Sequence, residues 1–179
     1  MTRYHELIEL LSDLKPKHIV EIGTWNGKRA SEMMAVTGAY YTGFDLFEDA
    51  DKDSDERELN VKQHHELIDV AERLEFCGTR RFKLIRGDTN KTLPEWIESP
   101  DFQPFDFAFI DGGHSKATID SDFQHIFKAI DEGGTIVMDD YYRPKLDGFG
   151  CNHLKIRGEL FNNWDRFTQG EVTMLKVET

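Results

Sequence analysis

The chain has 179 residues, about the length of one domain, and 22 Lys and Arg against 34 Asp and Glu give a formal charge of 22 − 34 = −12. This charge opposes binding to nucleic acid or to an anionic membrane surface. Two cysteines are too few for a disulfide scaffold, and no apolar run approaches the roughly 18 residues of a membrane-spanning helix. We therefore expect a cytoplasmic protein with one domain over residues 1–179.

Apolar runs of strand length alternate with segments of helical period, which is typical of βαβ units around a parallel sheet. In chain order the pattern predicts helix 4–14, strand 17–22, helix 28–36, strand 40–44, a charged and solvated segment 48–58, helix 60–77 and strand 81–86. Strand 105–110, helix 118–130 and strand 135–138 follow. The tail is predicted to contain helix 151–161 and then strands 164–168 and 171–177, joined at Gln169-Gly170 as a closing hairpin.

The first predicted strand runs into a glycine-containing loop, Glu21-Ile-Gly23-Thr-Trp25-Asn-Gly27, before a helix. Glycines in this position let a ligand approach the backbone closely. A dinucleotide loop needs a third, central glycine, so the bulky Trp25 argues against NAD or FAD and against a nicotinamide-dependent oxidoreductase. S-adenosylmethionine has no phosphate, and Glu21 could help to hold its ammonium group. An ordinary tight turn is the alternative interpretation.

Two further strand ends carry candidate cofactor contacts. Asp45 lies 45 − 23 = 22 residues after Gly23, close to the spacing of about 20 at which an acidic residue binds ribose hydroxyls. Its alternative role is a helix cap or a solvated loop acid. The sequence Gly87-Asp88-Thr89 could border an adenine ring, although Gly-Asp is also common in turns.

Three aspartates stand at the ends of two later strands, Asp111 before Gly-Gly-His114, and the pair Asp139-Asp140. The carboxyl ends of neighbouring parallel strands meet at one crevice, so these carboxylates can meet there. Carboxylate oxygens suit a hard divalent cation such as Mg²⁺ or Ca²⁺. The alternatives are that Asp111 orients the cofactor ammonium and that Asp139 or Asp140 caps the next segment.

Taken together and in this order, these motifs resemble class I S-adenosylmethionine-dependent methyltransferases, specifically the small-molecule O-methyltransferase group with catechol-type and macrolide-sugar enzymes. The resemblance covers residues 17–177. It implies an α/β, Rossmann-like fold with a mainly parallel seven-stranded sheet, a reversed last strand and helices on both faces. It also implies metal ligands and cofactor contacts: Asp111, Asp139 and Asp140 for the metal, and Gly23, Thr24, Trp25, Gly27, Asp45, Leu46, Asp88, Thr89 and Asp111 for the cofactor.

The chain departs from the catechol-type pattern at two places. That pattern has Asp-Asn where this chain has Asp139-Asp140, and a lysine three residues beyond the strand-end aspartate, where this chain has His114. A neutral imidazole can accept a hydroxyl proton near physiological pH, so we predict His114 and Asp111 as the catalytic residues. Weaker candidates are Lys116, Tyr141 and Tyr142. The remaining histidines, including His64 and His65, are interpreted as surface or packing residues.

The predicted function is O-methylation of a small hydroxylated molecule, such as a sugar or a catechol-like compound, with S-adenosylmethionine as donor and Mg²⁺ or another divalent cation assisting. Two alternatives stay open: a protein that binds S-adenosylmethionine without transferring its methyl group, and a metal-independent methyltransferase. Nucleic-acid amine methylation is disfavoured, because Asp-Gly-Gly-His stands where those enzymes have an Asn/Asp-Pro-Pro-Tyr motif. The identity of the acceptor and the existence of a homodimer are left open.

Overall fold

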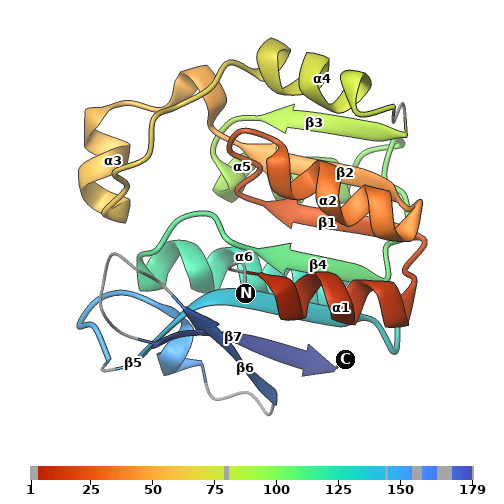
Figure 1. The fold of residues 1–179 in the computed structure, drawn as a ribbon. Coiled ribbons are helices and arrows are strands. Elements are labelled where there is room, and N and C mark those ends of the chain that lie inside the picture. Colours follow the sequence, from red (N-terminus) through yellow and green to blue (C-terminus); the bar gives the residue numbers. More distant parts are fainter. Residues whose placement is uncertain (1–3, 79–80, 144, 155–158, 165–170, 179) are drawn as a thin grey trace.

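The computed structural model describes residues 4–78, 81–143, 145–154, 159–164 and 171–178 (Figure 1). Its centre is a sheet of seven strands in the order β3-β2-β1-β4-β5-β7-β6. The strands are β1 (His18–Ile22), β2 (Tyr40–Asp45), β3 (Phe82–Arg86), β4 (Phe107–Ile110), β5 (Thr135–Arg143), β6 (Glu159–Trp164) and β7 (Glu171–Glu178). The first five pair in parallel, and β7 runs antiparallel to both β5 and β6. The expected α/β fold with a mainly parallel sheet is confirmed.

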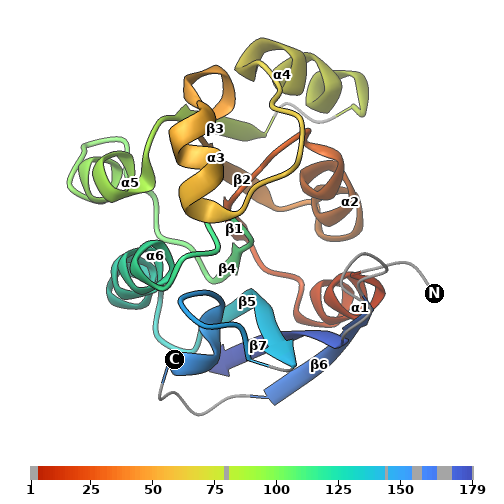
Figure 2. The same cartoon turned by 90° about the vertical axis from the view of Figure 1, so that its left-hand side faces the viewer.

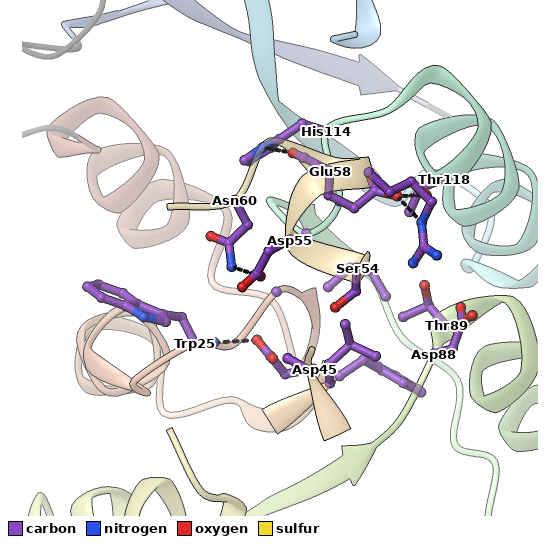
Figure 3. Close-up of a pocket in the computed structure, with 18 of the residues that line it drawn as sticks. Trp25, Asp45, Ser54, Asp55, Glu58, Asn60, Asp88, Thr89, His114 and Thr118 are labelled. Atoms are coloured by element: carbon purple, nitrogen blue, oxygen red, sulfur yellow. Dashed lines mark hydrogen bonds and ion pairs between the residues drawn. The ribbon is translucent and has the colours of Figure 1, made fainter. Parts of the chain in front are cut away.

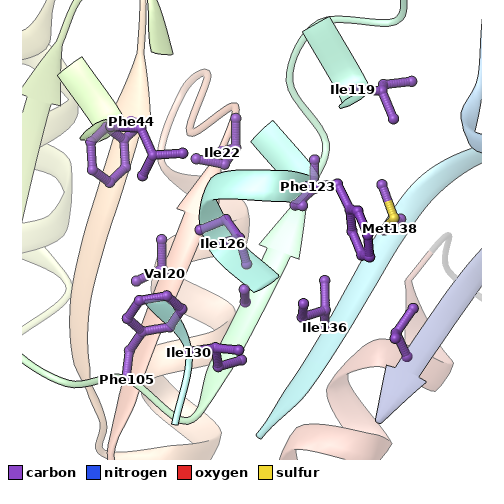
Figure 4. Close-up of a cluster of buried hydrophobic side chains, with 14 of the residues drawn as sticks. Val20, Ile22, Phe44, Phe105, Ile119, Phe123, Ile126, Ile130, Ile136 and Met138 are labelled. Atoms are coloured by element: carbon purple, nitrogen blue, oxygen red, sulfur yellow. The ribbon is translucent and has the colours of Figure 1, made fainter. Parts of the chain in front are cut away.

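Helices cover both faces of this sheet (Figures 1 and 2). One face carries α1 (His5–Leu14), α2 (Lys28–Thr37) and α4 (Leu67–Phe76), and the other carries α5 (Thr89–Ile97) and α6 (Lys116–Ala129). Alternate side chains of a strand point to opposite faces, so β4 divides its residues between two cores. Phe107 and Phe109 pack with α1 and α2, whereas Ala108 and Ile110 join the cluster beneath α5 and α6 that is drawn in Figure 4. The central strands are therefore buried on both sides, as in other parallel sheets.

The segment predicted to be solvated, residues 48–58, is instead structured. It contains the 3₁₀ turn η1 (Phe47–Asp49) and the helix α3 (Lys52–Glu58), which starts with a capping box between Asp51 and Ser54. Ser54 and Glu58 are buried even though most of the helix is charged. Figure 2 shows α3 in front of the carboxyl ends of the parallel strands. The helix predicted over residues 60–77 begins only at Leu67, which leaves an irregular segment between α3 and α4.

The tail also differs from its prediction. The helix expected over 151–161 is a short 3₁₀ turn, η2 (Cys151–His153), and residues 159–164 form β6 against β7. Gly158 weakens a helix, and the aromatic residues Phe161 and Trp164 favour a strand, so pairing with β7 overrides the helical pattern. The strand predicted over 164–168 is therefore placed too late in the sequence. Its last residues and the Gln169-Gly170 turn lie outside the described residues.

No helix among the described residues is both long and apolar enough to cross a membrane.

Candidate functional site

A pocket opens at the carboxyl ends of β1, β2, β3 and β4, where α3 lies over it (Figure 3). Most of the predicted cofactor contacts line this pocket, namely Gly23, Trp25, Asp45, Leu46, Asp88, Thr89 and Asp111. His114 lines it as well. The structure thus brings together residues that are up to 91 positions apart in the sequence, since 114 − 23 = 91.

The loop after β1 crosses the end of β4 without space for a side chain. Gly23 has φ +90°, and a Cβ atom built on it would lie 2.1 Å from the carbonyl oxygen of Asp111. Its backbone N–H donates to the carbonyl of Phe44 at 2.8 Å, which fixes the turn against β2. Gly27, with φ +73°, then caps the start of α2. This close approach requires glycine, so the pocket wall at Gly23, the Gly23 cradle, is formed by backbone alone.

Asp45 is held in a fixed orientation at the end of β2. Its Oδ2 accepts the backbone N–H of Trp25 at 2.7 Å, and its Oδ1 accepts that of Phe47 at 2.9 Å (Figure 3). Each carboxylate oxygen can accept more than one hydrogen bond, so both oxygens retain capacity for the two hydroxyls of a ribose. The chemistry of this acceptor fits the sugar of S-adenosylmethionine.

Asp88 and Thr89 form the opposite side of the pocket at the start of α5. Asp88 caps this helix and accepts the backbone N–H of Asn90 at 3.0 Å. The turn chemistry considered as an alternative for Gly87-Asp88 is therefore present, and both residues line the pocket as well. Helix capping and pocket lining do not exclude each other at this position.

Glu21 and Thr24 lie behind the pocket rather than among its lining residues. Glu21 is 1% exposed and accepts a hydrogen bond from the hydroxyl of Tyr41, which also contacts the Thr24 hydroxyl at 3.1 Å. Burial raises the pKa of Glu21 to about 8, although the Tyr41 hydrogen bond acts in the opposite direction. Burial therefore favours the neutral form of this carboxyl, which offers less charge to a cofactor ammonium than an exposed carboxylate would.

Among the pocket residues that were not predicted as site residues are Asp55, Asn60 and His64, which form a polar cluster. Asp55 accepts from the Asn60 amide at 2.8 Å and lies 3.0 Å from Nε2 of His64. His64, interpreted from the sequence as a surface or packing residue, lies among the residues that line the pocket. The sequence did not predict this cluster, because residues 48–58 were expected to be solvated and Asn60 and His64 were placed in a predicted helix over residues 60–77.

The segment between α3 and α4 is tied to the loop after β1 through Trp25. The Trp25 indole N–H donates to the carbonyl of Gln63 at 2.8 Å, and the Lys62 ammonium lies 5.5 Å from the centre of the indole ring. Trp25 therefore holds the segment around Lys62 and Gln63, which closes one side of the pocket.

A second group of polar side chains combines Asp111 and His114, which follow β4 and line the pocket, with Asp140 from within β5. One ligand atom from each of Asp111, His114 and Asp140 lies within 4.8 Å of the other two. The two carboxylates suit a hard divalent cation such as Mg²⁺ or Mn²⁺, and the imidazole nitrogen of His114 is either a third ligand or a base beside the cation. The donor chemistry therefore fits the expected cation, with His114 in the place expected for Asp139.

Asp139 lies within hydrogen-bond distance of Tyr4, near the N-terminus. The hydroxyl oxygen of Tyr4 lies 2.8 Å from Oδ2 of Asp139 and 2.8 Å from Oδ2 of Asp111. A hydroxyl has a single proton, so it donates to one of these carboxylates at a time. Tyr4 was not predicted from the sequence, because 107 residues separate it from Asp111.

A bulge in β5 explains how two consecutive aspartates both face inward. The register of β5 against β7 shifts between Met138 and Tyr141, and Asp140 has φ +64°. In a regular strand, neighbouring side chains point to opposite faces, and a bulge re-aims one of them. The left-handed backbone of a non-glycine residue costs about 1–2 kcal/mol, so the surrounding contacts must stabilise Asp140 in this conformation.

Asp122 on α6 is a buried carboxyl behind the pocket. It is 1% exposed, and neither oxygen has a hydrogen-bond partner among the described residues. Burial raises its pKa to about 7, and the nearby Thr89 hydroxyl lowers it only in part. In the unfolded chain the pKa of an aspartate is about 3.9. Between about pH 3.9 and pH 7 the folded protein therefore keeps a proton on Asp122 that the unfolded chain has lost.

We expect the stability contribution of Asp122 to be lost as the pH rises towards its folded pKa. The free energy of unfolding of Asp122→Asn minus that of the unchanged protein should increase by about 2 kcal/mol between pH 5 and pH 8. Urea unfolding at both pH values measures it. A constant difference between the two proteins would contradict the raised pKa.

Comparison with known proteins identifies the family. A family model described as a methyltransferase domain matches residues 20–141. This range includes the loop after β1 and the acidic residues Asp45, Asp88, Asp111, Asp139 and Asp140. None of the curated proteins compared by sequence gives a significant match.

Several solved structures share the fold. The O-methyltransferase TomG from Streptomyces achromogenes, solved with S-adenosylmethionine, aligns with a TM-score of 0.70 at 17% identity, over 97% of this chain and 78% of its own. An O-methyltransferase from Bacillus cereus, solved with S-adenosylhomocysteine, gives 0.70 at 17% identity, over 97% and 79%. An rRNA methylase from Streptococcus thermophilus gives 0.63 at 15% identity, over 99% and 97%. At these identities the structures show a shared fold and leave the acceptor open.

The chain belongs to the methyltransferase domain family and is an S-adenosylmethionine-dependent methyltransferase with a Rossmann-like α/β fold.

Proposed function

We propose that this protein transfers the methyl group of S-adenosylmethionine to a hydroxyl oxygen of a small molecule, assisted by a divalent cation. The observation that carries the proposal is the position of Asp111, His114 and Asp140, which lie together at the end of the pocket that Gly23 and Asp45 line. The cofactor supplies an activated methyl group on a sulfonium. A cation held by the carboxylates would make a hydroxyl proton easier to remove.

His114 is proposed as the group that takes the hydroxyl proton. Its Nδ1 lies 2.7 Å from the backbone carbonyl of Glu58, which can only accept, so Nδ1 carries a proton, and in the neutral imidazole the lone pair is then on Nε2. Nε2 lies 3.5 Å from Oδ2 of Asp140, on the side of the acidic group. One lone pair cannot bind a cation and a proton together, so we assign Nε2 to the proton and the carboxylates to the cation.

The remaining residues are proposed to orient the reactants. Asp45 binds the ribose, and Asp88 and Thr89 border the adenine, which fixes the cofactor relative to Asp111. Holding two reactants in the attacking geometry can account for several kcal/mol of a barrier. The formal charge of −12 supports a small acceptor rather than RNA, although an rRNA methylase has the same fold.

The test is a methyl-transfer assay on purified protein with S-adenosylmethionine and a panel of catechols, sugars and one short RNA. Each reaction runs with excess EDTA, and again with Mg²⁺ or Mn²⁺ added back, while S-adenosylhomocysteine is measured. We expect transfer to vicinal diols that EDTA abolishes and the cation restores. Transfer that EDTA leaves unchanged would contradict cation assistance. Transfer to RNA alone would contradict the small-molecule acceptor.

A further inference from the structure

We propose that Glu58, the last residue of α3, is a positioning residue that fixes the ring orientation and the tautomer of His114. This inference rests on the proposed function, because it assigns His114 the role of proton acceptor. Glu58 acts through two sets of contacts, one from its side chain and one from its backbone carbonyl.

The side chain of Glu58 anchors α3 to the start of α6. Its Oε2 accepts the backbone N–H of Ser115 at 2.8 Å, and its Oε1 accepts the hydroxyls of Thr118 at 2.7 Å and Ser115 at 3.1 Å. A carboxylate at a helix N-terminus is also stabilised by the helix dipole. Glu58 is 7% exposed, so these charge-assisted hydrogen bonds are shielded from water.

The backbone of Glu58 acts on His114 directly. Its carbonyl accepts the hydrogen bond from Nδ1 of His114 at 2.7 Å, which selects the tautomer with the proton on Nδ1 (Figure 3). Without this acceptor, the proton can occupy either ring nitrogen, and a proton on Nε2 would block the lone pair that the reaction needs.

The turn before His114 leaves space for this arrangement. A Cβ atom built on Gly113 would lie 2.8 Å from Oε2 of Glu58 and 2.6 Å from Cγ2 of Thr118. A side chain at position 113 would therefore displace the Glu58 carboxylate. The second glycine of the Asp-Gly-Gly-His sequence therefore has a packing reason.

The same helix also covers the cofactor pocket. Ser54 and Asp55, in the preceding turn of α3, line the pocket opposite Asp45 and Asp88. Because α3 is only seven residues long and ends at Glu58, its position over the cofactor and its hold on His114 depend on one short element. Glu58 thereby links closure of the cofactor pocket to the orientation of the base.

Nitrogen NMR of histidine-labelled protein tests the inference without any acceptor. The His114 signals are assigned by their loss in His114→Gln, since the chain has seven histidines. The unchanged protein should show His114 with the proton on Nδ1. Glu58→Ala keeps the backbone carbonyl but loses the contacts to Ser115 and Thr118, so α3 should shift away from His114 and a mixture of tautomers should appear. Glu56→Ala is the matched control, because Glu56 lies on the same helix and pairs only with the exposed Lys52 at 3.4 Å among the described residues. An unchanged tautomer in Glu58→Ala would overturn the inference.

Kinetics separate positioning from a general loss of structure. Glu58→Ala should lower kcat about 10- to 100-fold with little change in the KM for the acceptor, and Glu58→Gln, which keeps one acceptor oxygen, should recover part of the rate. Equal losses of kcat in Glu58→Ala and Glu56→Ala would overturn the positioning role. If the tautomer shifts in Glu58→Ala but no acceptor is methylated by the unchanged protein, the positioning stands and the proposed O-methylation fails.

Discussion

Replacing Gly23 with alanine is expected to lower the free energy of unfolding by about 2–5 kcal/mol and to abolish measurable S-adenosylmethionine binding. The added Cβ would meet the carbonyl oxygen of Asp111 at 2.1 Å, and the backbone at φ +90° disfavours any side chain. Overpacking costs about 1–3 kcal/mol and the left-handed conformation about 1–2 kcal/mol. Relief of the clash requires the loop after β1 to move away from β4, which opens the cradle.

Gly38→Ala is the matched control for this substitution. Gly38 has φ +67°, but nothing lies within 4 Å of a Cβ built on it, so only the backbone term of about 1–2 kcal/mol applies. Urea unfolding and calorimetry measure both variants. Equal losses of stability, with cofactor binding retained in Gly23→Ala, would show that the close approach to Asp111 does not shape the cofactor site.

Replacing His114 with alanine is expected to lower kcat about 10²- to 10⁴-fold, the range that a general base contributes. The dissociation constant for S-adenosylmethionine should change little, because the groups assigned to the ribose and adenine are untouched. His125→Ala provides the control, since His125 lies on α6 and its Nδ1 contacts the carbonyl of Ser121 at 2.8 Å.

Cation affinity shows whether Nε2 of His114 accepts the hydroxyl proton or binds the cation. If His114 is the base, Mn²⁺ should bind His114→Ala about as tightly as the unchanged protein, and the rate should stay low at saturating Mn²⁺. A rate that excess Mn²⁺ restores would contradict the base and assign His114 to the cation instead.

The sequence predicts the parts of the site that depend on strand ends. Gly23, Asp45, Asp88 and Asp111 each follow an apolar run, and parallel strands must bring their carboxyl ends to one edge of the sheet. For these residues, local pattern and topology agree, and all four line the pocket.

Tertiary contacts determine the parts that the sequence did not predict. The burial of Glu58 depends on donors from Ser115 and Thr118, 57 and 60 residues away, so its charged helix reads as solvated. Tyr4 reaches Asp139 across 135 residues. The inward aim of Asp140 depends on a bulge opposite β7, which the pattern of apolar residues does not encode. Long-range hydrogen bonds leave no periodic signal in a single sequence.

Calorimetric titration with S-adenosylmethionine tests the central claim most directly, with NAD as the control ligand and with and without Mg²⁺. The pocket between Gly23, Asp45 and α3 predicts micromolar binding of S-adenosylmethionine and none of NAD, whose pyrophosphate would meet Trp25 where a dinucleotide loop has glycine. Preference for NAD, or no binding of S-adenosylmethionine, would contradict the cofactor assignment on which the proposed reaction depends.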